Sequence, residues 1–574
     1  MIYYEISSAN PLSAYLQIKT TFTVTQPDAP LYLQLSAWRP GRYELQNFAQ
    51  KIQGFRILNQ DNSPVTFNKI TKDRWEVQPA GSTEITVYFN FYARQLDAGG
   101  SWIDESQLYV NPVNCLPAVV GQEQQPAELK LNIPESWQVA CGLKQLNAHT
   151  LTADNYDQLV DSPLIASANL KLASYEVNGI PFYIWIQGEC KPDWGRIIQD
   201  FSAFTQEQIM LFGDFPVKDY YFLNQILPYK FYHGVEHGNS TVITLGPGEL
   251  LMGKSLYKDF VGVSSHELFH TWNIKKIRPA EMLPYDYSGE NYFRTGFVAE
   301  GITTYYGDYI LARAGVYTVD DYFEELNKVL SKHFGDYGHQ NYSVADSSFD
   351  LWLDGYKPGV PDRKVSIYHK GALAAIILDL EIRRSTNNVY SLDTVMQRLW
   401  EEFGKPGIGY TEADYQRLVR EVAGSGTEKY FNEIIYGTAP IQQYLDKALH
   451  YVGCTLIKEE SPVLTETLWG FKTAAGNNSY LAVSAIAPES PSYNGLSLDD
   501  ELIALNGRKI EGNISGLLEN QQEVTLSFFR NKQLREVKLQ TNGNRYFQKY
   551  YIQKLPDAKL VDKANFYLWL KQRF

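Results

Sequence analysis

The sequence is poor in the residues that support a disulfide framework, a thiolate metal site or a basic binding face. Its four cysteines, Cys115, Cys141, Cys190 and Cys454, are scattered and form no CxxC pair, so neither disulfides nor a cysteine-bound metal are expected. Lys and Arg number 52 against 65 Asp and Glu, and the net charge of -13 argues against a nucleic-acid partner, because phosphates bind to basic faces. Any metal is therefore expected on histidine and carboxylate side chains.

Long apolar runs are also missing. The most apolar stretch, 372–378, is closed by Asp379 and is far shorter than the roughly 20 residues of a membrane-spanning helix. The first residues, 1–6, lack the basic and apolar segments of a secretory signal. We therefore expect no membrane span and a cytoplasmic protein; a secreted form from which a signal has been trimmed is the alternative.

The length and the patterning predict several domains. At 574 residues the chain is too long for one hydrophobic core, because single cores stop growing near about 250 to 300 residues. Residues 1–173 contain short segments of alternating apolar and polar residues, such as 15–22 and 84–91, which predict an N-terminal antiparallel β domain. Short strands return in 451–545, and a Tyr-rich tail, 546–574, follows.

Residues 174–450 have a different pattern, with long helical periods, and all the candidate chemistry lies there. The predicted helices cover residues 193–211, 254–273, 295–314, 319–334 and 369–384. This region is therefore predicted to be the catalytic domain of an α+β protein.

The run His266-Glu267-Leu268-Phe269-His270 carries the clearest chemical signal. Two histidines four apart on a helix project from one face, so both imidazoles can bind one ion, and Glu267 beside them can act as general base toward a metal-activated water. Zinc suits such ligands and polarises a scissile carbonyl. With nine histidines in the chain, a chance match has a probability on the order of 1%. The run predicts a zinc peptidase.

A catalytic zinc ion needs a third protein ligand and one open position. Glu300 is the best candidate, because it is a lone charged residue in the apolar and aromatic run 297–306 and is costly to bury unless it is paired or binds a metal. Glu281 and Glu290 are the weaker alternatives, since they lie in a Pro- and Gly-bearing connection that nothing holds rigid.

A rival pattern precedes this run. His233-Gly234-Val235-Glu236-His237 fits the inverted HxxEH signature and also spaces two histidines by four. The glycines within and after it favour an extended strand, in which residues four apart are separated by about 13 Å. We therefore expect an edge strand that lines the cleft, with Glu236 free to meet a cationic group of the substrate.

Together these motifs resemble the glycyl aminopeptidase family of gluzincin zinc metallopeptidases, and the helix pair also resembles that of the aminopeptidase N family. The resemblance implies a thermolysin-like, mainly helical catalytic domain with one zinc ion per chain, bound by His266, His270 and Glu300. It is carried by the sequences HELFHTWN at 266–273, AEG at 299–301, YHKGAL at 368–373 and WRPGRY at 38–43.

The resemblance also assigns roles around the metal. Glu267 would be the general base, and Tyr368 would donate its hydroxyl to the tetrahedral oxyanion, which can stabilise a transition state by about 3 kcal/mol. Gly234, Glu236 and His237 would lie on the substrate strand, with Glu236 pairing with the free N-terminal ammonium. A carboxylate at a fixed distance from the metal would restrict cleavage to the first peptide bond.

Two departures leave questions open. The chain has Glu-His-Gly-Asn where the aminopeptidase N family has Glu-Asn, which leaves the amine-binding role of Glu236 open. Thr304 stands four residues after Glu300, where thermolysin-like enzymes carry a carboxylate, so the residue that supports the zinc histidines is unassigned.

The C-terminal region resembles a PDZ domain. Residues 490–507 resemble its core, and Leu468-Trp469-Gly470-Phe471 resembles its carboxylate-binding loop. Such modules bind a peptide C-terminus as an added strand. The groove is either open for a peptide or packed in an architectural role. The expected fold is thus a multidomain α+β protein: an antiparallel β domain, a thermolysin-like catalytic domain and a PDZ-like β/α domain.

The leading hypothesis is a zinc-dependent aminopeptidase that hydrolyses the first peptide bond of peptides with small N-terminal residues, Gly or Ala, a preference implied by the resemblance. An endopeptidase of the same mechanism and a non-catalytic PDZ peptide-binding adaptor are the alternatives. Peptide substrates are the expected partners, with a peptide C-terminus at the PDZ domain as a further candidate.

Overall fold

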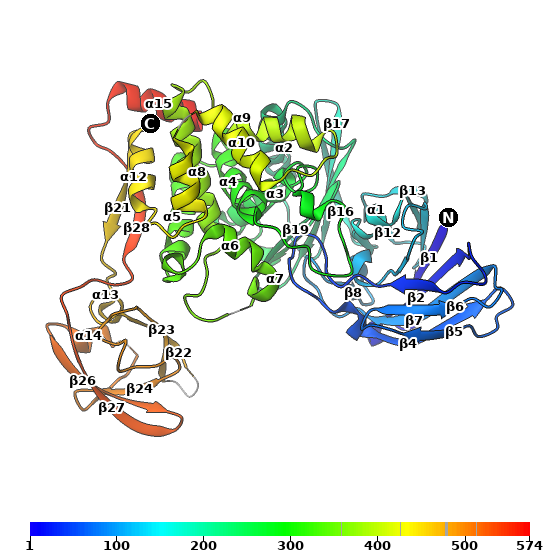
Figure 1. Ribbon diagram of the computed structural model, residues 1–574, viewed down its shortest axis with the longest axis horizontal. Helices are drawn as coiled ribbons and strands as arrows, with labels where there is room; N and C mark the ends of the chain where they lie inside the picture. Colours follow the sequence, from blue (N-terminus) through cyan, green and yellow to red (C-terminus); the bar gives the residue numbers. More distant parts are fainter. Residues whose placement is uncertain (358, 425, 477–479, 513) are drawn as a thin grey trace.

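The computed structural model describes residues 1–357, 359–424, 426–476, 480–512 and 514–574. A β-rich N-terminal part, a helical middle and a C-terminal β module follow one another along the chain (Figure 1). This order confirms the expected multidomain α+β class. No helix within these ranges is long and apolar enough to cross a membrane.

The N-terminal part is built on a seven-stranded sheet in the order β13-β14-β11-β1-β2-β7-β4. Side chains along β2 and β7 alternate between buried and outward-facing positions, because successive residues of a strand point to opposite faces. The strands predicted at 15–22 and 84–91 are therefore confirmed. The strands of this sheet are β1 (Ile2–Ser7), β2 (Tyr15–Thr23), β4 (Ile52–Asn59), β7 (Glu84–Tyr92), β11 (Ala127–Asn132), β13 (Lys144–Asn147) and β14 (Thr150–Ala153).

One pair in this sheet departs from the antiparallel expectation. β1 runs parallel to β11, with Ile2 opposite Ala127, whereas the other pairs of the sheet are antiparallel. The two strands are far apart in sequence, so the chain can re-enter at the same end of the sheet. A period of two predicts a strand but not its pairing direction.

Two four-stranded sheets complete this part, in the orders β10-β3-β6-β5 and β12-β15-β9-β8. Their strands are β3 (Leu31–Gln34), β5 (Thr66–Lys69), β6 (Arg74–Gln78), β8 (Trp102–Ile103), β9 (Gln107–Val110), β10 (Ala118–Val119), β12 (Gln138–Cys141) and β15 (Leu164–Ser167).

The catalytic part begins with a five-stranded sheet in the order β16-β17-β18-β20-β19. The edge strand β19 contains the first four residues of the HxxEH pattern, His233 to Glu236, and pairs antiparallel with β20. This confirms that the pattern is not helical: His233 lies on the strand, and His237 follows directly after its last residue. The strands are β16 (Lys171–Val177), β17 (Ile180–Gln187), β18 (Tyr220–Ile226), β19 (Phe231–Glu236) and β20 (Ser240–Gly246).

Helices pack against this sheet and against one another, and all five predicted helical periods are observed (Figure 1). The helix predicted for 254–273 ends earlier, at Phe269, with His270 as its C-cap. The early end has a tertiary cause, because the side chain of Asn273 bonds to the segment around Glu300 instead of continuing a helix. These elements are α2 (Trp194–Phe212), α3 (Lys254–Phe269), η6 (Phe297–Ile302), α4 (Thr303–Arg313), α5 (Val319–His333) and α8 (His369–Ser385).

The π-helical turn η6 and the helix α8 cross at two glycines. A Cβ atom on Gly301 would lie 2.5 Å from the Cα of Gly371, a distance that no side chain tolerates. The crossing brings the first turn of α8, with Tyr368 at its N-cap, against the turn that carries Glu300. Further helices behind this crossing are α9 (Leu392–Leu399), α10 (Glu412–Ala423) and α12 (Gln442–His450).

The C-terminal module has its own core and a sheet in the order β22-β23-β24-β26-β27 (Figure 1). The short helix α14 (Ser515–Leu518) precedes β26. Its strands are β22 (Phe471–Ala475), β23 (Leu481–Ile486), β24 (Glu501–Leu505), β25 (Arg508–Lys509), β26 (Glu523–Arg530) and β27 (Gln533–Gln540), with β25 paired to β24.

The last residues return to the catalytic part rather than trailing from the module. β28 (Lys549–Lys554) pairs with β21 (Cys454–Glu459), and α15 (Leu560–Leu570) lies beside the helical body in Figure 1. The indole of Trp569 is fully buried and donates to the hydroxyl of Tyr305 at 3.1 Å. Residues 546–574 thus form part of the catalytic core.

Candidate metal centre and active site

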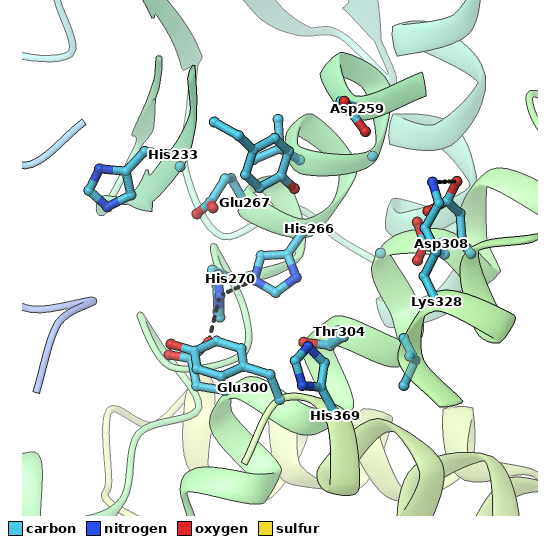
Figure 2. A pocket seen from close by; sticks show the side chains of 18 of the residues that line it. His233, Asp259, His266, Glu267, His270, Glu300, Thr304, Asp308, Lys328 and His369 are labelled. Atoms are coloured by element: carbon cyan, nitrogen blue, oxygen red, sulfur yellow. Dashed lines mark hydrogen bonds and ion pairs between the residues drawn. The ribbon is translucent and has the colours of Figure 1, made fainter. Parts of the chain in front are cut away.

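Three side chains from two elements converge in the helical part (Figure 2). His266 lies in the last turn of α3, His270 caps that helix, and Glu300 lies in η6. Their ligand atoms all lie within 4.8 Å of one another. His270 Nε2 is 3.1 Å from His266 Nε2 and 3.4 Å from Glu300 Oε2. The structure therefore brings together the three residues predicted as zinc ligands.

A second group overlaps the first. The carboxylates of Glu236 and Glu267 lie within 4.8 Å of each other and of His270. Both side chains are buried, and Glu236 Oε1 and Glu267 Oε2 have no hydrogen-bond partner in the described part of the chain. Three buried carboxylates, those of Glu236, Glu267 and Glu300, thus share one small volume.

The electrostatics of this volume call for a cation. Burial, together with neighbouring carboxylates, raises the pKa of Glu267 and of Glu300. Burial lowers the pKa of His266 well below its ordinary value, which keeps the imidazole neutral, whereas Glu300 overcomes burial and raises the pKa of His270 to about 10. A divalent ion would compensate the carboxylates and take the imidazole nitrogens as ligands. The nitrogen and carboxylate donors therefore fit zinc.

The sequence left the support of the predicted zinc histidines unassigned, and for His270 this support comes from Asn273. Its backbone carbonyl is 2.9 Å from His270 Nδ1, so it fixes the ring with Nε2 toward Glu300. Its side-chain amide donates to the carbonyls of Val298 and Ala299 and thus ties the end of α3 to η6. Thr304 lines the cavity and supplies no carboxylate there.

The N-terminal part also reaches the centre, through the loop that carries the WRPGRY sequence. The Tyr43 hydroxyl donates to Glu300 Oε1 at 3.1 Å, and both side chains are buried. Gly41 lies against Glu236, with φ +80 and so little space that a Cβ would lie 2.4 Å from Glu236 Oε2. Sequence reasoning noted this motif as a family signature, but nothing in it located these residues at the active site.

The edge strand β19 supplies one wall. Tyr232, Gly234 and Glu236, at alternate positions, line the same cavity as the metal donors. A Cβ on Gly234 would lie 2.3 Å from Glu267 Oε1, so only glycine lets the strand pass this carboxylate.

His237 is not brought into the cavity. Its Nδ1 lies 3.1 Å from Asp161 Oδ1, and Lys275 Nζ lies 2.8 Å from Asp161 Oδ2. These groups join the N-terminal part to the end of β19. His237 thus lies at the contact between the N-terminal and catalytic parts, although its neighbour in sequence, Glu236, lines the cavity.

Tyr368, at the N-cap of α8, lines the same cavity. Its hydroxyl is 3.3 Å from that of Tyr356, which in turn lies near the backbone of Tyr43. Burial and Glu300 raise the pKa of Tyr368 well above its ordinary value, so the hydroxyl keeps its proton.

The remaining predicted residues lie elsewhere. Glu281 and Glu290 are exposed and outside both donor groups. The segment Leu468 to Phe471 leads into β22, with Trp469 and Phe471 buried in the core of the C-terminal module and Gly470 at φ +73. It is remote from the metal donors.

Two family models match the chain. The Peptidase M61 N-terminal domain matches residues 3–168, and the M61 glycyl aminopeptidase model matches residues 259–374, which contain both histidines and Glu300. No curated protein matches in sequence.

Solved structures resemble the chain as well. An aminopeptidase N family protein from Idiomarina loihiensis is 27% identical, over 99% of this chain and 100% of that chain, with a TM-score of 0.89. An M1 zinc metallopeptidase from Deinococcus radiodurans, bound to a Tyr-Ser-Ala substrate, is 14% identical over 76% of this chain and 94% of that chain, with a TM-score of 0.48.

The family matches and the donor set define a zinc metallopeptidase of the aminopeptidase type. The chain matches the models of both the N-terminal domain and the catalytic domain of the M61 glycyl aminopeptidases. This confirms the resemblance found in the sequence.

Proposed function

We propose that the protein removes small N-terminal residues, Gly or Ala, from peptides, with one zinc ion on His266, His270 and Glu300. The observation that carries the proposal is the Glu236 carboxylate, buried, without a hydrogen-bond partner at Oε1 in the described residues, and within 4.8 Å of Glu267. A buried carboxylate of this kind requires a cationic partner, and the free ammonium of a peptide supplies one. The family description, glycyl aminopeptidase, supports the small residue.

Glu267 is the proposed general base. Zinc, when bound, supplies Lewis acidity that lowers the pKa of a bound water and polarises the scissile carbonyl. The free Oε2 of Glu267 is positioned to take a proton from the attacking water and to pass it to the leaving amine. Because burial raises the pKa of Glu267, its carboxylate is a stronger base than an exposed one.

Tyr368 is the proposed oxyanion donor. Its hydroxyl keeps its proton, and its side chain lines the cavity that holds the metal donors. A fixed donor aimed at developing negative charge in a site sheltered from water stabilises the transition state more than the ground state.

The proposed restriction to the first peptide bond rests on the loop that closes the cavity at Glu236, where the substrate amine would bind. Gly41 packs against Glu236 and leaves no space for even a methyl group between them. A peptide residue preceding the one whose amine meets Glu236 would collide with this loop. The distance from Glu236 to the metal donors then selects the first peptide bond.

The test compares free and N-acetylated Gly-Ala peptides as substrates. We expect hydrolysis of the free peptides only; equal cleavage of both would favour the endopeptidase alternative. Glu267→Gln should bind zinc and lower kcat by about 10² to 10⁴, whereas the matched exposed variant Glu281→Gln should keep full activity. Substantial turnover by Glu267→Gln would overturn the mechanism.

We also propose the domain limits 1–173, 174–450 and 451–545, with a PDZ-type peptide site in the third. The sequence Leu468 to Phe471 leads into β22, whose first residue is Phe471, and no strand pairs with the outer edge of β22 in the described part of the module. An edge strand behind such a loop is where a peptide C-terminus adds as a strand. A labelled peptide should bind with a free C-terminal carboxylate and not as its amide; equal binding would contradict the site.

A further inference from the structure

The catalytic cavity extends well beyond the metal donors and ends in acidic side chains. It has a volume of about 370 Å³. Positions along strand β19 mark successive places in the cavity, because Glu236, Gly234 and Tyr232 face the same side at two-residue steps of about 7 Å. Gly234 lies at Glu267, Glu236 lies toward the amine end, and Tyr232 lies toward the opposite end.

Two carboxylates stand at that opposite end. Asp259 lies on α3, seven residues before His266, and Asp308 lies on α4, eight residues after Glu300. At 1.5 Å per residue, each is about 10 to 12 Å along its helix from the zinc donor of that helix. Figure 2 shows His233 of β19 on one side of Glu267, and Asp259 and Asp308 on the other.

Neither carboxylate has a partner. Among the described residues, Asp259 and Asp308 form no hydrogen bond and no ion pair, and burial raises the pKa of both, to about 7 for Asp308. Three lysines, Lys258, Lys328 and Lys332, also line the cavity. Lys258 and Lys328 partly offset the charge of the two aspartates, but their ammonium groups pair with the α5 carboxylate Glu325, at 3.0 Å and 2.8 Å, and not with Asp259 or Asp308.

The walls between the metal donors and this acidic end are apolar. Val263 and Val329 are buried and line the cavity, and Tyr232, which is 60% exposed, stands at its open side near Asp308. Gly262 lines the same part of the cavity and has no side chain to narrow it. A Cβ at this position would lie 3.0 Å from the Tyr317 hydroxyl. An apolar channel with an acidic end matches a side chain that has an aliphatic stem and a cationic tip.

We propose that Asp259 and Asp308 form a specificity pocket for a lysine or arginine as the second residue of the substrate. The inference rests on the proposed function: with the amine at Glu236 and the first peptide bond at Glu267, the residue after that bond lies toward Tyr232. The four-carbon stem of lysine spans about 6 Å, which matches one two-residue step along β19. Its ammonium replaces the missing partner of the two carboxylates.

The test uses peptides Gly-X-Ala with X as Lys, Arg, Gln, norleucine or Glu, and measures kcat/KM for glycine release. We expect Lys and Arg to exceed Gln and norleucine by roughly tenfold or more, and Glu to be the poorest. Asp308→Asn and Asp259→Asn should each bring the Lys-to-Gln ratio toward one while hydrolysis of Gly-Gln-Ala stays within about twofold of the wild type. The matched control Asp320→Asn, which removes an exposed carboxylate at the start of α5, should keep the preference.

A wild-type Lys-to-Gln ratio near one, or an unchanged ratio in both Asn variants, would overturn the pocket. Its failure is distinguishable from failure of the proposed function, which would show as no release of glycine from any peptide. Binding of the same peptides to the Glu267→Gln variant by calorimetry supplies a second measurement: tighter binding of Gly-Lys-Ala than of Gly-Gln-Ala supports the pocket, and equal binding contradicts it.

Discussion

Tyr43 of the N-terminal domain donates a hydrogen bond of 3.1 Å to Glu300 of the catalytic domain, between residues 257 positions apart in sequence. Tyr43 is 1% exposed and Glu300 is 2% exposed, so water does not replace this donor. The N-terminal domain therefore contributes to the proposed metal centre, and this bond to Glu300 forms only when the two domains are assembled.

Replacing Tyr43 with Phe should weaken zinc binding. The variant keeps the ring and its packing but leaves Glu300 Oε1 without the donor, and loss of such a supporting bond typically lowers metal affinity or activity by about 10- to 100-fold. Zinc affinity measured by competition with a chelator checks this. Tyr32→Phe removes a comparable bond, to Glu76, away from the centre and should change nothing. Equal zinc affinity in Tyr43→Phe and the wild type would contradict the supporting role.

Substitutions should decide between the two overlapping donor groups. Glu300→Gln is expected to lose zinc, whereas Glu236→Gln is expected to retain it and to raise KM for peptides with a free amine, because the ammonium loses its carboxylate partner. Zinc content by elemental analysis and steady-state kinetics measure the two effects. Loss of zinc in Glu236→Gln with retention in Glu300→Gln would reverse the assignment of the third ligand.

Gly234→Ala should impair catalysis without unfolding the protein. The new methyl group would lie 2.3 Å from Glu267 Oε1, so either the carboxylate or the edge strand has to move. A displacement of about 1 Å at a general base is enough to reduce kcat by roughly 10²-fold. Kinetics and a thermal melt check this prediction. Gly238→Ala, at the turn after β19, is the matched control and should keep kcat.

Acid should weaken the junction between the domains. Lys275 and His237 hold the pKa of Asp161 below its ordinary value in spite of burial, so the carboxylate stays charged in the folded protein at a pH where the unfolded chain takes up a proton. This contribution to stability is complete above about pH 5 and is lost progressively as the pH falls through 4 and below. Urea unfolding at pH 7, 5 and 4 should show the decline, and Asp161→Asn should show less of it.

At pH 7, Asp161→Asn should also destabilise the protein outright. Lys275, whose side chain is 2% exposed, would be left buried without its anion, which costs about 3 to 5 kcal/mol. Glu460→Gln breaks the exposed pair with Arg545 and should cost less than about 1 kcal/mol. Similar losses in the two variants would show that the Asp161 contacts do not join the domains.

The features that could be predicted from the sequence are those that depend on residues only a few positions apart. The spacing of one helical turn was enough to predict that His266 and His270 project from the same face. The cost of burying a charge was enough to single out Glu300 in its apolar run. The strand assignment of the HxxEH pattern followed from its glycines. Each of these depends on neighbours in sequence, and the geometry agrees with each.

The features that were missed depend on contacts between distant segments. Nothing local to Tyr43 indicates that its hydroxyl meets Glu300, and nothing in the run 254–273 indicates that Asn273 turns away to bond Val298. Nothing in the sequence near Asp308 indicates that α3, α5 and β19 lie around its side chain. Periodicity shows which residues of a helix or strand share a buried face, but it does not show which other segment packs against that face.

Residues 546–574 provide the clearest test of such a distant contact. Trp569 is fully buried against α4, where its indole donates to Tyr305 and its carbonyl accepts from the Tyr309 hydroxyl at 2.8 Å. Trp569→Ala should therefore destabilise the catalytic domain by about 3 to 5 kcal/mol, through the cavity and the loss of the indole hydrogen bond to Tyr305. Tyr567→Ala, at a 55% exposed position of the same helix, should cost less than about 0.5 kcal/mol. Because α4 follows directly after η6, a loosened α15 should also lower zinc affinity, and a Trp569→Ala protein that melts like the wild type would show that the last helix only rests on the surface.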